Sequence, residues 1–173
     1  MKLSALILIP TISSLLLALS AAPKKPIMSW PPASETNYVD VDKFDLDPDL
    51  EITLWAKSPL FYNPTNMSID PKGRIWVTEG VNYREKLGIR RNAGDRIMVL
   101  IDTDQDGKAD QSKVFLQDPY LESPLGISVF DNKIIISQPP DIVIYTDVNR
   151  DLKFDPKIDK KEILLTGFNG RQH

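Results

Sequence analysis

The sequence contains no cysteine and a single histidine, His173, which is its last residue. Without cysteine the chain has no disulfide framework, no thiolate zinc site, no thiol nucleophile and no attachment point for a c-type haem. One terminal histidine leaves no internal histidine for a Ser-His-Asp triad or a multi-histidine metal site. Chemistry in these 173 residues must therefore use carboxylates, Arg, Tyr, Lys or a bound cofactor.

Glutamate is also scarce, with 6 Glu against 18 Asp. Aspartate suits turns and short loops of oxygen ligands, whereas glutamate suits helices. The formal net charge is −3, so neither a nucleic-acid backbone nor an anionic lipid surface is a natural partner. The composition predicts a loop-rich protein with little helix.

Residues 1–22 have the pattern of a secretory signal peptide. Lys2 precedes an apolar run at 3–19, and small residues follow at 20–22. We therefore expect an exported protein, periplasmic or secreted. An uncleaved membrane anchor is the alternative, because the run approaches the roughly 20 residues that span a bilayer, although Pro10 and three serines in the run weaken it.

A linker rich in Pro and Asp follows at 23–49, where proline removes backbone donors and the aspartates repel one another. A cation site in this stretch is the alternative to a solvated approach, but no glycine is present to let the chain wrap an ion. From residue 50 to residue 173 the sequence changes to short apolar runs, rich in Ile, Val and aromatics, bounded by turn residues. These runs predict an all-β chain of nine strands at 51–56, 67–70, 74–78, 96–101, 113–116, 126–130, 133–137, 142–146 and 162–165.

The strands repeat along the chain. MSIDPKGRIWVTE (67–79) aligns with ISVFDNKIIISQ (127–138), and RIMVLIDTDQDGKAD (96–110) aligns with DIVIYTDVNRDLKFD (141–155) at a constant offset of 45 residues. Each unit then has a two-strand hairpin, a third strand, an Asp-rich loop and a fourth strand, which is typical of β-propeller blades. The sequence therefore predicts a partial β-propeller with blade one at 66–117 and blade two at 125–166.

The strand expected at 51–56 would be the outer strand of a blade completed elsewhere. Two blades and a spare strand cannot close a ring, because propellers typically have about four to eight blades. We therefore expect either the amino-terminal part of a larger protein or a truncated reading frame.

The first Asp-rich loop, DTDQDGKAD at 102–110, has the spacing of a calcium loop. Alternating short carboxylates around a glycine turn form a cage of hard oxygen ligands that suits Ca²⁺. Lys113 stands where an EF-hand has its bidentate Glu, which favours a β-hairpin calcium loop, and an Asp-rich solvated turn is the alternative. The expected ligands are Asp102, Asp104, Asp106, the carbonyl of Lys108, and Asp110.

The second copy, DVNRDLKFD at 147–155, keeps oxygen ligands at Asp147, Asn149, Asp151 and Asp155. Leu152 replaces the turn glycine, and a left-handed conformation costs a side chain roughly 1 kcal/mol or more. With one carboxylate fewer as well, this loop is expected to be a weak calcium site or a relic.

The connection at 79–96 is longer than its counterpart QPPD at 138–141, and long loops on a rigid scaffold tend to carry function. It contains Arg84, Arg90 and Arg91, which strand alternation predicts at the end of the blades opposite the Asp-rich loops. A cationic cluster there suits a ligand that bears a carboxylate. The alternative is an exposed loop in which arginine pairs with Asp95 or Glu85.

Four segments together carry a family resemblance that covers roughly residues 48 to 173: NPTNMSIDPKGRIWVTEGVNYR, GDRIMVLIDTDQDGKAD, SPLGISVF and EILLTGFNGRQH. The joint pattern resembles the amino-terminal propeller of the membrane-bound dehydrogenase family, also called PVC-type haem-binding CxxCH proteins. That family is similar to the soluble quinoprotein glucose and sorbosone dehydrogenases.

The resemblance implies a six-bladed propeller, a pyrroloquinoline quinone cofactor and a sugar or alcohol substrate. It also implies partners beyond these residues, namely the remaining blades and a downstream c-type haem domain, although this chain has no haem motif. The related enzymes use a histidine as general base, so the resemblance implies His173 as the catalytic candidate. Arg84, Arg90 and Arg91 would line the cofactor.

Two functions from different classes follow from the sequence. The first is the amino-terminal part of an exported, calcium-binding quinoprotein dehydrogenase, inactive on its own. The second is a calcium-stabilised propeller without catalysis, which binds glycans or another exported protein.

Overall fold

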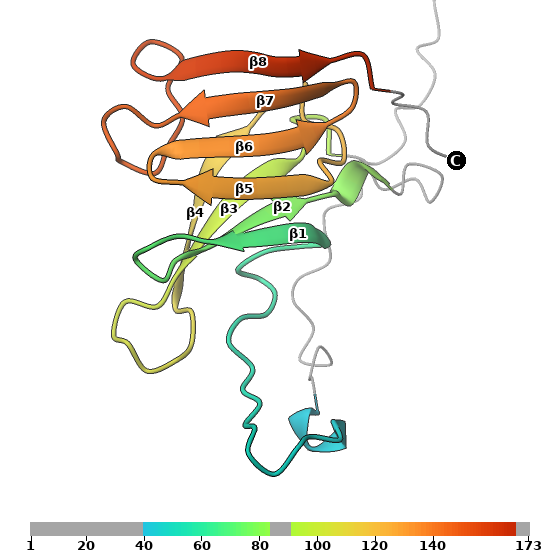
Figure 1. Ribbon diagram of the computed structural model, residues 1–173, viewed down its shortest axis with the longest axis vertical. Coiled ribbons are helices and arrows are strands. Elements are labelled where there is room, and N and C mark those ends of the chain that lie inside the picture. The colour runs from blue at the N-terminus through green and yellow to red at the C-terminus, as the bar shows by residue number, and fades with distance from the viewer. Residues whose placement is uncertain (1–39, 84–90, 169–173) are drawn as a thin grey trace, which may run out of the picture.

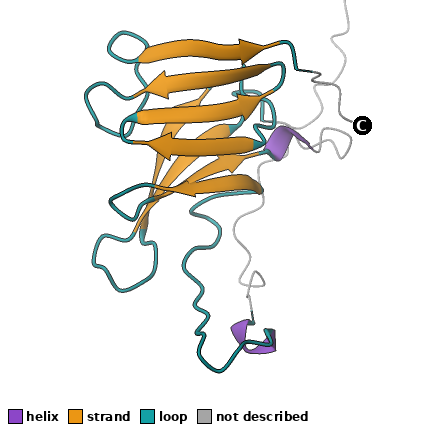
Figure 2. Ribbon diagram, viewed as in Figure 1, coloured by secondary structure: helices purple, strands orange, loops and turns teal. Residues whose placement is uncertain are grey.

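The computed structural model describes residues 40–83 and 91–168, and the regular structure of this part of the chain is β-strand with almost no helix (Figures 1 and 2). Its strands form two antiparallel four-stranded sheets, in the orders β1-β2-β3-β4 and β5-β6-β7-β8. One short 3-10 helix, η1 (Val41–Lys43), lies ahead of the sheets. The described chain is therefore all-β, as predicted, and its two sheets do not close into a barrel. The strands are β1 (Pro64–Ile69), β2 (Ile75–Glu79), β3 (Arg96–Ile101), β4 (Gln111–Gln117), β5 (Gly126–Phe130), β6 (Lys133–Gln138), β7 (Asp141–Thr146) and β8 (Lys160–Thr166).

Eight of the nine predicted strands are confirmed, and the prediction of a strand at 51–56 is wrong. That segment is irregular and joins no sheet. The backbone carbonyl of Trp55 accepts a hydrogen bond from the amide of Ala109 at 2.8 Å, in a loop rather than in a ladder. Trp55 instead packs against the face of the first sheet. The apolar character of this segment therefore comes from packing on a sheet face, and not from pairing within a sheet.

The two sheets repeat each other in register as well as in order. Trp76 pairs with Val99 in the first sheet, and Ile135 pairs with Ile144 at the corresponding place in the second. The ladder of β3 with β4 shifts register after Ile97, and the ladder of β7 with β8 shifts 45 residues later, after Ile142. The internal repeat that the sequence predicts is thus preserved down to the position of an irregularity.

The sheets pack face to face, with β1 beside β5 and the outer strands diverging from that edge (Figure 1). The core between them draws aromatic and aliphatic side chains from both sheets. The rings of Trp76 and Phe115 meet edge to face at 5.1 Å, and Tyr145 and Phe154 meet in the same way at 5.0 Å. The members of this core with almost no exposed surface are Trp76, Ile97, Val99, Phe115, Leu121, Ile134, Ile136, Val143 and Tyr145.

A second, smaller core lies on the other face of the first sheet. Val77, Met98 and Leu100 are buried there by residues 54–61, an irregular segment that we call the strap. Trp55 and Phe61 are among the strap residues that make this contact. The strap is part of the chain that leads into β1 in Figure 1.

The connections separate onto two ends of the sheets (Figure 1). The β3–β4 and β7–β8 loops, which hold the two Asp-rich segments, emerge at one end. The connection that follows β2, the β4–β5 linker and the end of β8 emerge at the opposite end. Across residues 40–83 and 91–168, no helix has the length and apolar character needed to cross a membrane. The predicted signal segment lies outside the described residues.

Candidate functional site

The first Asp-rich loop gathers three carboxylates. Oxygens of Asp102, Asp104 and Asp106 lie within 4.8 Å of one another. Asp102 organises the turn, because its carboxylate accepts the amide hydrogens of Asp106 at 3.2 Å and Gly107 at 2.9 Å. Gly107 has a φ of +85°, which a residue without a side chain adopts at little cost. The loop thus brings together three of the oxygen donors that the sequence predicts for a calcium ion.

Asp110 has a different set of contacts from the other predicted ligands. Its carboxylate accepts the backbone amide of Thr103 at 3.2 Å and the Thr103 hydroxyl at 2.5 Å. Asp110 therefore ties the end of the loop to its beginning, and the group of three carboxylates does not include it. Lys108, the predicted carbonyl ligand, donates its amide hydrogen to Asp106 at 2.8 Å, which continues the turn.

The second Asp-rich loop has the same hydrogen bonds 45 residues later. Asp147 accepts the amides of Asp151 at 3.2 Å and Leu152 at 3.0 Å, as Asp102 does in the first loop. Leu152 adopts the left-handed φ of +66° in the place of the glycine. Its side chain is only 9% exposed and belongs to the core between the sheets. The sequence alone takes Leu152 as a sign that the second loop is a weak site or a relic. In the structure, this leucine preserves the turn and also adds buried apolar surface.

Asp159, and not the predicted Asp155, matches Asp110 in its contacts. Asp159 accepts the amide of Val148 at 2.8 Å, and Asp110 accepts the amide of Thr103 at the corresponding place. Asp155 instead accepts the amide of Lys157 at 2.9 Å. Sequence reasoning missed Asp159 because residues 155–158 lengthen the second loop. The available signal was that both aspartates immediately precede the fourth strand of their sheet.

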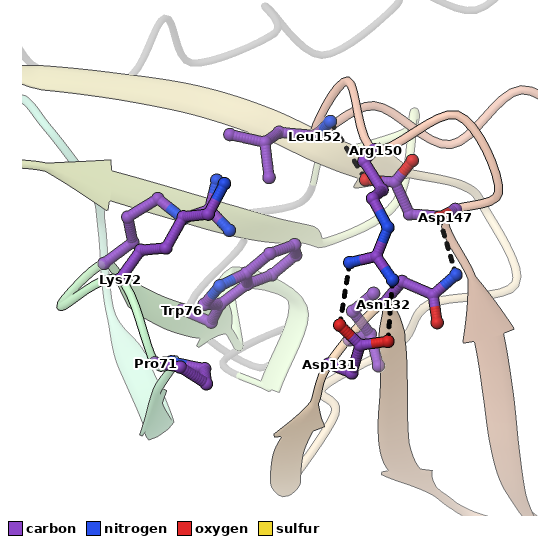
Figure 3. A pocket seen from close by; sticks show the side chains of 10 residues that line it. Pro71, Lys72, Trp76, Asp131, Asn132, Asp147, Arg150 and Leu152 are labelled. Atoms are coloured by element: carbon purple, nitrogen blue, oxygen red, sulfur yellow. Dashed lines mark hydrogen bonds and ion pairs between the residues drawn. The ribbon is translucent and has the colours of Figure 1, made fainter.

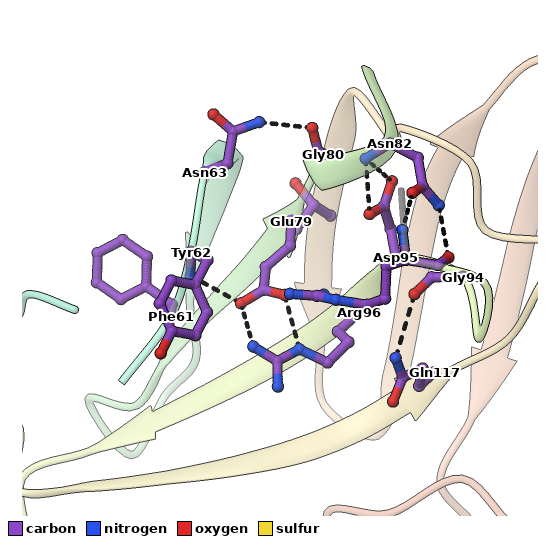
Figure 4. Close-up of polar contacts among 12 residues, drawn as sticks. Phe61, Tyr62, Asn63, Glu79, Gly80, Asn82, Gly94, Asp95, Arg96 and Gln117 are labelled. Carbon is purple, nitrogen blue, oxygen red and sulfur yellow. Dashed lines mark hydrogen bonds and ion pairs between the residues drawn. The ribbon is translucent and has the colours of Figure 1, made fainter. Parts of the chain in front are cut away.

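At the opposite end of the sheets, Arg91 is the one predicted cofactor-facing residue within the described part of the chain. It donates to the fully buried carboxylate of Glu79 at 2.5 Å, and Figure 4 shows that carboxylate with its other partners, Arg96 and Tyr62. Arg96 binds the same carboxylate through two hydrogen bonds of 2.7 Å, and the amide of Tyr62 donates a further one at 2.8 Å. Arg84, Arg90 and His173 lie outside the described residues.

Asp95 fastens the long connection that follows β2 to the linker between the sheets. Its buried carboxylate accepts the amides of Asn82 at 3.1 Å and Ser123 at 2.7 Å. Burial raises the pKa of this carboxyl, and the two amide hydrogen bonds oppose that rise. Gly94 beside it has a φ of +86°, and a Cβ there would stand 1.8 Å from the Asp118 carbonyl oxygen, so glycine is required.

The linker also binds the second sheet through Tyr120. The Tyr120 hydroxyl is hydrogen-bonded to Asp141, and the Lys161 ammonium lies 3.9 Å from the centre of the Tyr120 ring. Burial and the bond to Asp141 raise the pKa of Tyr120 to about 12. The phenol therefore stays protonated at neutral pH, where it serves as a hydrogen-bond donor that holds the linker.

A small cavity of about 100 Å³ opens between the sheets at the end that carries the Asp-rich loops (Figure 3). Trp76 and Lys72 lie on one side of it, while Asp131 and Arg150 lie on the other, paired through two bonds of 2.7 Å. The Trp76 indole is already satisfied, because its N–H donates to Asp70 at 3.0 Å. The cavity has room for a few water molecules or a small ion.

Comparison with known proteins gives one match. No curated protein and no solved structure matches the chain. The sequence model of one protein family matches residues 38–173, which include both sheets and the strap. The chain therefore belongs to the family described as Domain of unknown function (DUF7133).

Proposed function

We propose that the two sheets are consecutive blades of an exported β-propeller of the quinoprotein sugar or alcohol dehydrogenase type, and that its Asp-rich loops bind calcium. The observation that carries this proposal is the repetition of the two sheets. They share strand order, pairing register and the position of the irregularity in the outer ladder. Antiparallel four-stranded units that repeat and pack face to face are the building blocks of propellers.

Two features support calcium binding: the set of oxygen donors in the first Asp-rich loop, and the recurrence of the same turn in the second loop. Three carboxylates gather in the first loop, and a hard dication suits such a set of oxygens. The second loop keeps the hydrogen bonds that shape the turn, although an amide at Asn149 replaces one carboxylate. We therefore expect the first loop to bind more tightly than the second.

Isothermal titration calorimetry of the purified chain with calcium tests this proposal. We expect binding heat whose tighter component is lost when Asp102 and Asp106 are both replaced by Asn, because two of the three clustered carboxylates are then neutral. Asp45→Asn, in the linker, is the matched control and should leave the heat unchanged. No heat at millimolar calcium for the unchanged chain would reject the site.

Dehydrogenase chemistry rests on the resemblance in sequence, which assigns Arg84, Arg90 and Arg91 to the cofactor, and of these three only Arg91 lies within the described residues. Arg91 shares the carboxylate of Glu79 with Arg96, so its guanidinium is already engaged within the protein. The direct test is dye reduction with a panel of aldoses and alcohols, using the full-length protein reconstituted with pyrroloquinoline quinone. Turnover supports the dehydrogenase proposal.

The ion pair of Arg91 with Glu79 favours a second candidate, a calcium-stabilised propeller that binds glycans or another exported protein without catalysis. A buried pair of this kind holds a loop in place rather than offering charge to a ligand. Absence of turnover across the whole panel, together with intact calcium binding, would support this candidate over the dehydrogenase.

A further inference from the structure

The cavity of about 100 Å³ between the sheets is lined by side chains from both of them (Figure 3). Three of these side chains, Trp76, Ile134 and Leu152, are apolar and buried in the core between the sheets. The charged side chains come from the β1–β2 turn, the β5–β6 turn and the second Asp-rich loop. A concave space in which a few polar groups converge beside apolar ones is typical of a binding site, and the volume of this one suits a small ion.

Three cations from the two sheets face this cavity, and the chain does not use all their hydrogen-bond donors. Lys72 is exposed, and within residues 40–83 and 91–168 its ammonium group has no ion pair or hydrogen bond. Arg74 donates from Nε to Asp70 at 2.6 Å, and its two terminal nitrogens have no acceptor in the described part of the chain. Arg150 donates one hydrogen from each terminal nitrogen to Asp131. Since a guanidinium group has five N–H donors, both arginines keep donors for a further acceptor.

Two carboxylates also line the cavity, but both already have donors. Asp131 accepts two hydrogen bonds from Arg150, and Asp147 accepts two backbone amides of its own loop. Because Arg74 and Arg150 each have a carboxylate partner, the surplus positive charge of the lining lies on Lys72. An added anion therefore meets donors that lack an acceptor, whereas an added cation meets carboxylates that are already bound.

The backbone around the cavity is strained in a way that places these side chains. Asp131, Arg150 and Leu152 all have left-handed φ values, of +56°, +60° and +66°. Such conformations persist only where the surrounding structure fixes them, and they collect at ligand sites. Gln105 has nearly the same φ, +61°, 45 residues before Arg150 in the first Asp-rich loop. The turn therefore forms without an arginine, and the cation is specific to the loop that borders the cavity.

We propose that this cavity binds a tetrahedral oxyanion, phosphate or sulfate, between Lys72 and Arg74 of the first sheet and Arg150 of the second. Oxygens that point in several directions match donors that arrive from both sides, and bonds between charged partners are the stronger ones. The bound anion would bridge the two sheets at the end that carries the Asp-rich loops. Further blades would lie against the outer faces of the two sheets, and they leave the lining between the sheets unchanged.

A two-dimensional NMR spectrum of the nitrogen-labelled full chain tests the proposal through the indole N–H of Trp76. This group lines the cavity and donates to Asp70, the partner of Arg74. We expect its signal to shift and saturate with sodium phosphate and with sodium sulfate, and not with sodium chloride at equal ionic strength. The indole of Trp55, which is not part of this lining, is the internal control. Calcium-free buffer keeps the result independent of the proposed calcium sites.

Lys72→Gln combined with Arg150→Gln should weaken oxyanion binding by at least about tenfold, because two charged donors are lost. Glutamine is the residue at the place of Arg150 in the first loop, so the turn should still form. The matched control is Lys57→Gln with Lys113→Gln, which removes the same charge at two exposed positions outside the cavity. The control pair should bind as the parent does. If the double substitution at the cavity unfolds the chain, Lys72→Gln alone should still weaken binding.

Absence of a saturable Trp76 shift with both oxyanions would overturn the proposal, as would equal weakening by the control pair. Methyl phosphate and methyl sulfate separate two sources of the anion. Binding as tight as that of the inorganic ions would assign the cavity to an ester group on a larger molecule. Weaker binding of the esters would assign it to a free ion that joins the sheets, and either result supports an oxyanion site.

Discussion

Leu152 is a single residue in which backbone strain and burial oppose each other. Its left-handed φ of +66° costs about 1–2 kcal/mol for a residue with a side chain. Burial of the same side chain in the core between the sheets contributes more, since truncating a buried leucine typically costs about 2–5 kcal/mol. Gly107 has the matching φ in the first loop, where an added Cβ would meet no atom within 4 Å.

We expect Leu152→Gly to destabilise the chain by about 1–3 kcal/mol, because the lost packing exceeds the relieved strain. Gly107→Leu should also destabilise it, by about 1–2 kcal/mol, because the exposed position offers no packing in return. Urea unfolding followed by circular dichroism measures both changes. Stabilisation by Leu152→Gly would mean that strain at this position outweighs burial.

Asp70 makes the stability of the fold depend on pH in the acidic range. Burial of its carboxyl favours the neutral form, but hydrogen bonds from Trp76 and Arg74 outweigh it and the pKa of Asp70 is lowered. The pKa of an Asp carboxyl in the unfolded chain is about 3.9. Because the pKa of Asp70 in the folded chain is lower, the ionised carboxylate stabilises the fold at pH values above about 3.9. This stabilisation is lost as the pH falls from there through the folded-state pKa.

Asp70→Asn should therefore destabilise the protein above about pH 5, by roughly 1.5–3 kcal/mol for the loss of charged hydrogen bonds. The difference between variant and parent should shrink below about pH 4, where the parent also loses its charge. Urea unfolding from pH 3 to pH 7 measures the difference. A constant difference across this range would show that Asp70 acts through packing alone.

At the scale of single elements, the connection that follows β2 is held by the carboxylate of Glu79. Arg96 and Arg91 both bind Glu79, whose side chain has no exposed surface. Removing one partner from a buried ion pair is costly, because the remaining charge is left without its counter-ion.

We expect Glu79→Gln to destabilise the chain by about 3–5 kcal/mol, because two partly buried arginines then lose their shared anion. Arg91→Met should cost less, since Arg96 still forms two bonds with the carboxylate. Thermal unfolding by circular dichroism compares the two variants. An equal loss for both would mean that Arg91, rather than Glu79, organises the connection.

The sequence predicts correctly those strands that pair with a neighbouring strand in a sheet. Where the prediction fails, the failure has a physical cause. The runs that became β3 and β5 were predicted with their observed bounds, because turn residues flank continuous apolar stretches. The run at 51–56 has similar composition but packs on a sheet face, which hydrophobicity alone does not distinguish from pairing. Within the candidate site, the spacing of the aspartates predicts the carboxylate cluster that contains Asp102. Asp159 was missed because the alignment of the two loops at a constant offset of 45 residues does not allow for the extra residues 155–158 in the second loop.

At the scale of the whole molecule, the two sheets share one core. Trp76 from the first sheet belongs to the same buried cluster as Ile136 and Val143 from the second. Substituting a buried tryptophan by alanine typically costs about 3–5 kcal/mol, part of which is the cavity that remains. Because this cavity would border both sheets, the substitution should also lower the stability of strands that do not pair with the strand of Trp76.

Trp76→Ala should therefore raise native-state hydrogen exchange in β6 and β7 as much as in β2 and β3, because a shared core makes the sheets one cooperative unit. Met67→Ala, at a side chain that is 61% exposed, is the matched control and should leave exchange unchanged in all four strands. Hydrogen exchange read by mass spectrometry on peptides from each strand gives the comparison. Unchanged protection in β6 and β7 of the Trp76 variant would mean that each sheet unfolds on its own, so that the contact between them adds little to the stability of either.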